Sequence, residues 1–186
     1  MKRKFNVKFF LWLLGATTVV VTVFHGVHLL QARQTASGLL RMADQAEAKG
    51  NLQKARDYLG RYLKFVPENT EALARVGLIL DKQAVKDPKL RERALLVLDQ
   101  VLRREPGRGD LRRKAVHLAI GLKRFADAKT HLAVLMAEAP ADGELFHLLG
   151  VCEASSGKYA EAEKALKKAI NYPPKEIESY VFLATV

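Results

Sequence analysis

The stretch Gly143–Pro174, GELFHLLGVCEASSGKYAEAEKALKKAINYPP, decides the fold. Two helical patterns meet at the turn-like sequence Ser155–Lys158. In each pattern the apolar residues recur at i, i+3, i+4 and i+7, which places them on one face of a helix. Because neither helix can bury that face alone, we expect the two to pair as an antiparallel hairpin.

The same unit recurs along the chain. Two sets of positions are spaced 34 residues apart: Ala94, Ala128 and Ala162, and Pro106, Pro140 and Pro174. Ala55 and Pro67 precede their counterparts by 39 residues, which is the same period plus five. A fixed period in this range marks a repeat array. The period and the residues at its fixed positions resemble the tetratricopeptide repeat (TPR), which implies an all-α solenoid of helix-turn-helix units.

The array is expected to cover residues 36–186. The predicted repeats are about 36–69, 70–108, 109–142 and 143–176, and a fifth begins at 177–186. The five additional residues are expected within 82–89, where Pro88 cannot continue a helix interior and therefore marks a turn or the start of the next helix. Arg112 stands where the resemblance implies a large apolar residue, so the first helix of the third repeat is expected to begin a turn late.

The amino terminus has a different character. Residues 1–8 form a basic tail, and residues 9–32 contain no Asp, Glu, Lys, Arg or Pro. As a helix this run would be about 36 Å long, enough to cross about 30 Å of hydrocarbon. We predict an uncleaved single-pass membrane anchor, with a cleaved signal peptide as the alternative. The basic flank places the amino terminus in the cytoplasm and the repeats outside it, in the periplasm if the protein is bacterial.

Composition and motifs do not indicate an enzyme. The single cysteine, Cys152, excludes a disulfide within the chain and is expected to be a buried, inert thiol. The sequence contains no phosphate-binding glycine loop, no HExxH and no Gly-x-Ser-x-Gly. We therefore assign no catalytic, cofactor-binding or metal-binding residue.

Two candidate partner surfaces remain. In the register of the repeat, the first helix of each unit lines the concave side. The predicted partner-binding residues there are Leu40, Asp44, Leu78, Arg113, His117, His147 and Val151. Leu40 and Asp44 stand where some TPR domains have the Lys and Asn of a carboxylate clamp, so that activity is not carried over. The mixture of apolar and polar residues suits an extended or helical peptide.

The second surface is the junction between repeats two and three. The formal net charge of the chain is +11, and this junction holds its densest cluster. The basic patch comprises Arg103, Arg104, Arg108, Arg112, Arg113 and Lys114. It would suit an acidic protein segment or lipid headgroups, with a solvated surface of local ion pairs as the alternative. Nucleic acid is disfavoured because no aromatic residues are interleaved.

The sequence thus predicts a membrane-tethered TPR scaffold that binds a protein segment in its concave groove outside the cytoplasm. One alternative is the recruitment arm of a longer enzyme whose catalytic domain lies beyond Val186. Another is a secreted, cleaved array. If the protein ends at Val186, Tyr180, Phe182 and Leu183 would form an apolar helix with no following partner helix, which would favour docking or self-association there.

Overall fold

The computed structural model describes the backbone of residues 7–174 and 177–185, and their side chains except those of residues 7–11, 13 and 24–33. Throughout these described residues every regular element is an α-helix, which confirms the predicted all-α class. The chain divides into two compact units, Met1–Glu68 and Asn69–Val186, and each is described by itself.

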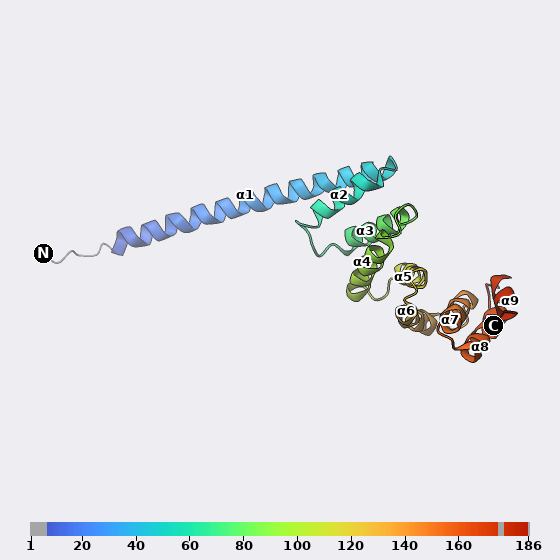
Figure 1. Cartoon of the computed structure of the whole chain (residues 1–186). Helices are drawn as coiled ribbons and strands as arrows, with labels where there is room; N and C mark the ends of the chain where they lie inside the picture. The colour runs from blue at the N-terminus through green and yellow to red at the C-terminus, as the bar shows by residue number, and fades with distance from the viewer. Residues whose placement is uncertain (1–6, 175–176, 186) are drawn as a thin grey trace. The chain divides into compact units, whose positions relative to one another are not determined.

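The first unit contains α1 (Val7–Ala48) and α2 (Leu52–Tyr62). Helix α2 packs beside the carboxyl-terminal part of α1 (Figure 1). The core of this unit is formed by small and aliphatic side chains: Ala36, Leu39, Ala43 and Ala46 of α1, and Ala55, Leu59 and Tyr62 of α2. A turn at Gly50 joins the two helices. Gly50 has φ +68°, a conformation that glycine adopts without steric cost, and Asn51 caps α2 by accepting a hydrogen bond from the Lys54 backbone.

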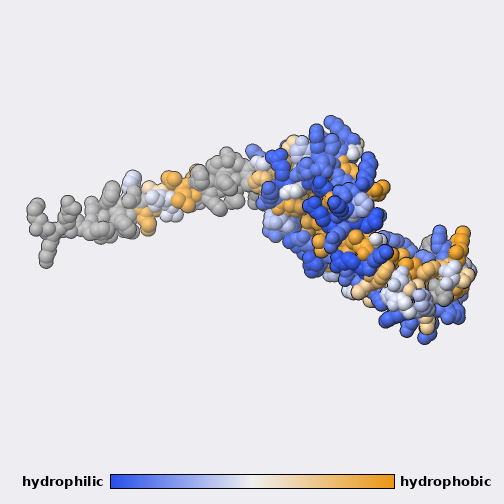
Figure 2. All heavy atoms as spheres, viewed as in Figure 1, coloured by the Kyte–Doolittle hydropathy of each residue, from blue (hydrophilic) through white to orange (hydrophobic). Residues whose placement is uncertain are grey.

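The amino-terminal part of α1 extends beyond this pair. Its described side chains include exposed apolar residues, and Figure 2 shows hydrophobic side chains on the surface of this helix. These are Trp12, Leu14, Val19, Val20, Val21 and Val23. Thr17, Thr18 and Thr22 each donate a hydrogen bond to a carbonyl one turn earlier.

The predicted span over residues 9–32 is not supported by the structure. Among the residues described, no helix carries an apolar stretch long enough to cross a membrane. The predicted span lies within α1, and its side chains at 9–11, 13 and 24–32 are outside the described set.

The second unit is a succession of helical hairpins (Figure 1). Its helices are α3 (Thr70–Gln83), α4 (Leu90–Arg104), α5 (Gly109–Gly121), α6 (Phe125–Glu138), α7 (Gly143–Ser155), α8 (Tyr159–Asn171) and α9 (Ile177–Leu183). Pairs α3–α4, α5–α6 and α7–α8 pack internally, and α4–α5, α6–α7 and α8–α9 pack between successive pairs. One hydrophobic core runs continuously from α3 to α7.

Small residues set the close approach within each hairpin. A Cβ atom at Gly150 of α7 would lie 2.7 Å from Cγ of Leu166 in α8, and one at Gly77 of α3 would lie 2.7 Å from Cδ2 of Leu98 in α4. Ala94, Ala128 and Ala162, the residues that reveal the period, are completely buried. The 34-residue spacing therefore marks the helix crossings, where a larger side chain would separate the backbones.

Most of the inserted residues lie in a turn. Residues 84–89 connect α3 to α4, with Pro88 before the first residue of α4. The expected late start of the next helix is wrong, because α5 begins at Gly109 and Arg112 is already in its first turn. Arg112 is only 7% exposed, so a cation occupies the position where an apolar side chain was expected.

Candidate partner-binding groove

The first helices of the second unit present equivalent residues at regular intervals. Arg113 of α5, His147 of α7 and Val181 of α9 are separated by the 34-residue period, as are His117, Val151 and Thr185. Leu78 of α3 precedes His117 by 39 residues, the longer interval that the insertion produces. One helix face thus repeats along α3, α5, α7 and α9.

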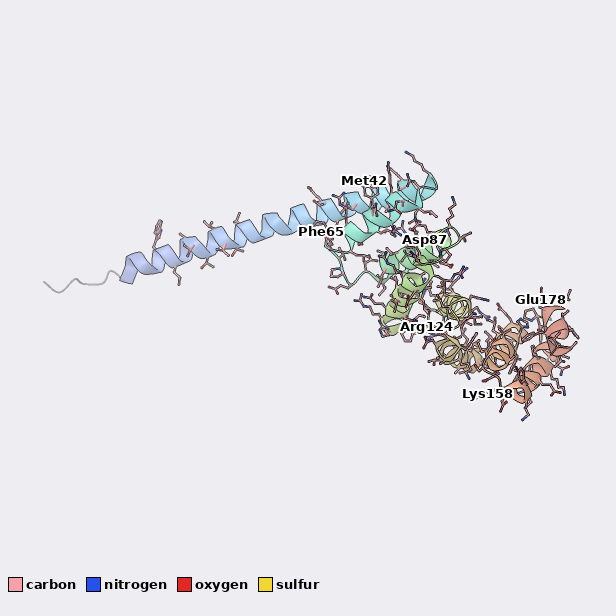
Figure 3. All side chains as sticks on the ribbon, viewed as in Figure 1. Met42, Phe65, Asp87, Arg124, Lys158 and Glu178 are labelled. Carbon is pink, nitrogen blue, oxygen red and sulfur yellow. The ribbon has the colours of Figure 1, made fainter. Side chains whose placement is uncertain are left out.

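A groove opens on this face between α7 and α9. It has a volume of about 480 Å³ and is mainly apolar, and we call it the α7–α9 groove. It is lined by His147, Val151, Ile177, Glu178, Val181, Phe182 and Thr185. Figure 3 labels Glu178 at the start of α9. The structure thus brings the predicted residues His147 and Val151 together with four positions not singled out from the sequence: Ile177, Glu178 and Val181 of α9, and Thr185 just after it.

A hydrogen bond between α7 and α9 fixes one wall of the groove. Nδ1 of His147 lies 2.8 Å from Oγ of Ser179, which is completely buried. This contact joins α7 to α9 and orients the imidazole ring beside the apolar lining. Ile177 and Val181 remain 76% and 63% exposed, so α9 presents uncovered apolar surface next to it.

A charged cluster lies next along the same face, between α5 and α7. Arg113 donates to Asp142 over 2.5 Å and to Glu144 over 2.7 Å, and these contacts raise the pKa of the Arg113 guanidinium, chiefly through Asp142. Nε2 of His117 lies 3.6 Å from the other oxygen of Glu144. Glu144 therefore connects the two α5 residues that the sequence placed in the groove.

The other predicted groove residues lie elsewhere. Leu78 is half-buried on α3 and packs against the core of the second unit. Leu40 and Asp44 belong to α1 in the first unit, where Leu40 is half-buried and Asp44 is exposed. Of the seven predicted partner-binding residues, the structure places two in the α7–α9 groove and two in the neighbouring charged cluster.

The predicted basic patch is not one cationic surface. Arg108 is engaged by Glu71, Glu105 and Asp110, and its pKa is raised chiefly by Asp110 and also by Glu71. Lys114 lies 3.8 Å from Asp81, and Arg113 is held by the cluster described above. Arg112 is buried, whereas Arg103 and Arg104 are exposed on α4. Sequence proximity groups these residues, but the helical period sends them to different faces.

Cys152 is completely buried in α7, and burial raises the pKa of its thiol to about 11, as expected of an inert core cysteine. The residues that the structure describes include no group of three or more His, Cys, Asp or Glu arranged to hold a metal ion.

The sequence comparisons agree with the helical hairpins. Residues 37–69 and 91–152 each match a family model described as tetratricopeptide repeat. The helical hairpins are TPRs. A comparison with curated proteins finds no match.

Solved TPR structures share the fold. The chain is similar to MamA 41-end from Desulfovibrio magneticus RS-1, with 22% identity, coverage of 81% of this chain and 82% of that one, and a TM-score of 0.67. It is also similar to YrrB, described as a TPR protein with an unusual peptide-binding site, with 18% identity, 81% and 75% coverage, and a TM-score of 0.66. A TPR protein from Parabacteroides merdae gives 19% identity, 80% and 57% coverage, and a TM-score of 0.65. These likenesses establish an α-solenoid of the TPR type, and proteins of this type generally serve as non-catalytic interaction scaffolds.

Proposed function

We propose that this TPR chain is a scaffold that binds an extended or helical segment of a partner protein in the α7–α9 groove. The observation that carries the proposal is the coincidence of an apolar groove of about 480 Å³ with the repeating face of the first helices. Extended peptides and amphipathic helices bind such grooves through regularly spaced apolar anchors. The similar protein YrrB, described as having an unusual peptide-binding site, supports the same class of ligand.

The groove chemistry favours apolar anchors over acidic ones. Val151, Ile177, Val181 and Phe182 supply the apolar lining, while Glu178 is the charged residue that lines the groove. The nearest arginine along this face, Arg113, already has two carboxylate partners. The acidic partner expected from the basic patch is therefore not part of the proposal.

Site-specific crosslinking tests the groove. A photo-crosslinking amino acid at Val181 in the full chain is expected to capture a partner in cells. The same probe at Val134, which is exposed on α6, is the matched control. Val151→Asp should remove the product at Val181, because a carboxylate in the apolar lining costs desolvation energy when the ligand binds. Equal capture at Val181 and Val134, or capture unaffected by Val151→Asp, would contradict the proposal.

The same experiment examines self-association through α9. A crosslinked product with twice the mass of the chain, containing only this sequence, would identify a second copy as the occupant. The exposed Ile177 and Val181 provide the apolar surface that such a contact would cover. A product of any other mass that contains a second protein supports the scaffold proposal.

We further propose that residues 9–32 tether the scaffold to a membrane, with the repeats outside the cytoplasm. The proposal rests on the uncharged sequence run and on the exposed apolar side chains in the described part of α1. The full chain should remain with membranes after alkaline carbonate extraction, and a variant lacking residues 9–32 should not. Release of the full chain by carbonate would refute the tether while leaving the groove proposal intact.

A further inference from the structure

A second, polar pocket lies on the side of the second helices in the Asn69–Val186 unit. It is formed between α4 and α6, the second helices of neighbouring hairpins, and includes Arg112 from the first turn of α5. Its volume is about 270 Å³. None of its lining residues lines the α7–α9 groove. We call it the α4–α6 pocket.

Arg112 is the unusual member of this pocket. Arg112 is only 7% exposed. Within the described chain its guanidinium donates to one acceptor, the Pro106 carbonyl, which lies 2.8 Å from Nη2. Its Nε is buried without a partner in that part of the chain. No carboxylate of the described residues forms an ion pair with it. Burying a cation without an ion-pair partner is energetically costly, so the surroundings of Arg112 favour an anion beside it.

Each of the two carboxylates of the pocket lies within ion-pair distance of a side chain other than Arg112. Asp127 accepts a hydrogen bond from Nε of Arg124 over 2.5 Å. Oδ1 of Asp99 lies 3.1 Å from Nε2 of His131, although this approach does not form an aligned hydrogen bond. Neither carboxylate forms an ion pair with Arg112 or with Arg103, which is exposed on α4, and the three arginines of the lining outnumber its two carboxylates.

The donors come from three helices and line one hollow. Arg103 lies near the end of α4, Arg112 in the first turn of α5, and Arg124 immediately before α6, where Figure 3 labels it. Nδ1 of His131 is a further buried polar atom without a partner in the described chain, and it acts as a donor only when that nitrogen carries a proton. The volume exceeds the roughly 30 Å³ share of one water molecule severalfold, so a group larger than water fits.

We propose that the α4–α6 pocket binds a small oxyanion, a phosphate or carboxylate group, through Arg112 and Arg103. Guanidinium groups present several N–H donors in a fixed plane that matches the oxygens of both groups. The anion supplies the counter-charge that the buried Arg112 lacks. This site is independent of the partner-binding groove and does not rest on the proposed scaffold function.

Calorimetric titration of the full chain in detergent, in a low-salt buffer without phosphate, tests the proposal. Inorganic phosphate and acetate are the two probes. We expect saturable binding of at least one of them at a single site. Arg103→Gln should weaken that binding about tenfold, the effect of losing one charge-assisted hydrogen bond. Arg104→Gln is the matched control, because it removes the same charge from the adjacent position outside the pocket and should leave affinity within about twofold.

Arg112→Met provides the second variant. It should abolish binding while retaining the helical content of the chain, because replacing an unpaired buried cation with an apolar side chain of similar length is tolerated. The bound probe should raise the melting temperature of the unmodified chain but not that of this variant. Preference for phosphate or for acetate identifies which oxyanion the site takes.

Two results would overturn the proposal. One is the absence of saturable binding for both probes. The other is equal weakening by Arg103→Gln and Arg104→Gln, which would mean that diffuse positive charge rather than the pocket attracts the anion. Because Arg103 and Arg104 are both exposed, neither result depends on the folding of the Arg112 variant.

Discussion

Cys152 illustrates how a single residue is controlled by its surroundings. It lies on α7 with no exposed surface, and burial raises the pKa of its thiol from 9.0 to about 11. At pH 8 the thiolate population is therefore about a hundredfold below that of an ordinary cysteine. We expect negligible labelling by iodoacetamide in the folded chain and rapid labelling in denaturant. Rapid labelling of the folded chain at pH 8 would contradict the burial of this side chain.

Replacing a helical glycine by alanine should have opposite effects on stability at Gly150 and at Gly60. Gly150→Ala would place a Cβ 2.7 Å from the fully buried Leu166, and overpacking of this kind costs about 1–3 kcal/mol. A Cβ added at Gly60 of α2 would meet no atom within 4 Å, so Gly60→Ala should stabilise by about 0.5–1 kcal/mol through helix propensity. Urea unfolding measures both. The packing explanation fails if the two variants change stability in the same direction.

The environments of some single residues can be predicted from the sequence, and those of others cannot. The burial of the repeated alanines and of Cys152 follows from period and residue size, which are properties of the sequence itself. The burial of Arg112 does not follow from the sequence, because the free-energy cost of burying this cation depends on which groups of α4 and α6 surround it. The 34-residue period is enough to place α9 beside α7. It does not identify the contact between His147 and Ser179, which joins residues 32 positions apart.

At the scale of elements, Asp142 combines two roles at the start of α7. Its Oδ1 caps the helix by accepting from the backbone of Glu144 and Leu145, and its Oδ2 accepts from Arg113 of α5. The same carboxylate thus satisfies two backbone donors that have no partner within the helix and ties one hairpin to the next. Isosteric substitution can separate these two contributions.

Asp142→Ala removes both the cap and the ion pair, and should destabilise the chain by about 1–2 kcal/mol from the cap alone. Asp142→Asn keeps a capping oxygen and loses only the charge, so its cost should be clearly smaller because Glu144 still holds Arg113. Chemical denaturation of both variants provides the measurement. Equal destabilisation by the two substitutions would show that the charge, and not the cap, dominates.

The element boundaries are also partly accessible from the sequence. The apolar patterns of the repeats indicate where the hairpin turns lie, and Pro88 correctly marks the turn before α4. The late start predicted for α5 is wrong, because a single polar residue at an apolar position does not break the helix. The structure accommodates Arg112 as a helical residue whose guanidinium reaches the Pro106 carbonyl.

At the scale of the molecule, the second unit has one core that continues from α3 to α7. Solenoids are stabilised by interfaces between neighbouring units, so damage at one interface should spread to its neighbours. Leu132 of α6 is fully buried in this core, and Leu132→Ala should cost about 2–5 kcal/mol. Hydrogen exchange should accelerate in α5, α6 and α7 together.

Val134→Ala is the control, because it shortens a partly exposed side chain two residues away on the same helix. It should change stability by no more than about 0.5 kcal/mol and leave the exchange pattern as it was. Acceleration confined to α6 in the Leu132 variant would indicate that this helix opens by itself rather than with its neighbours.

The inaccessibility of the one native thiol has a practical consequence for spectroscopy. Val85, in the turn between α3 and α4, is 83% exposed, so Val85→Cys would create a reactive thiol beside an unreactive one. Adding Asp57→Cys on the exposed side of α2 would place one spin label in each of the two units. Distance distributions between the labels could then be recorded by electron paramagnetic resonance without first removing Cys152.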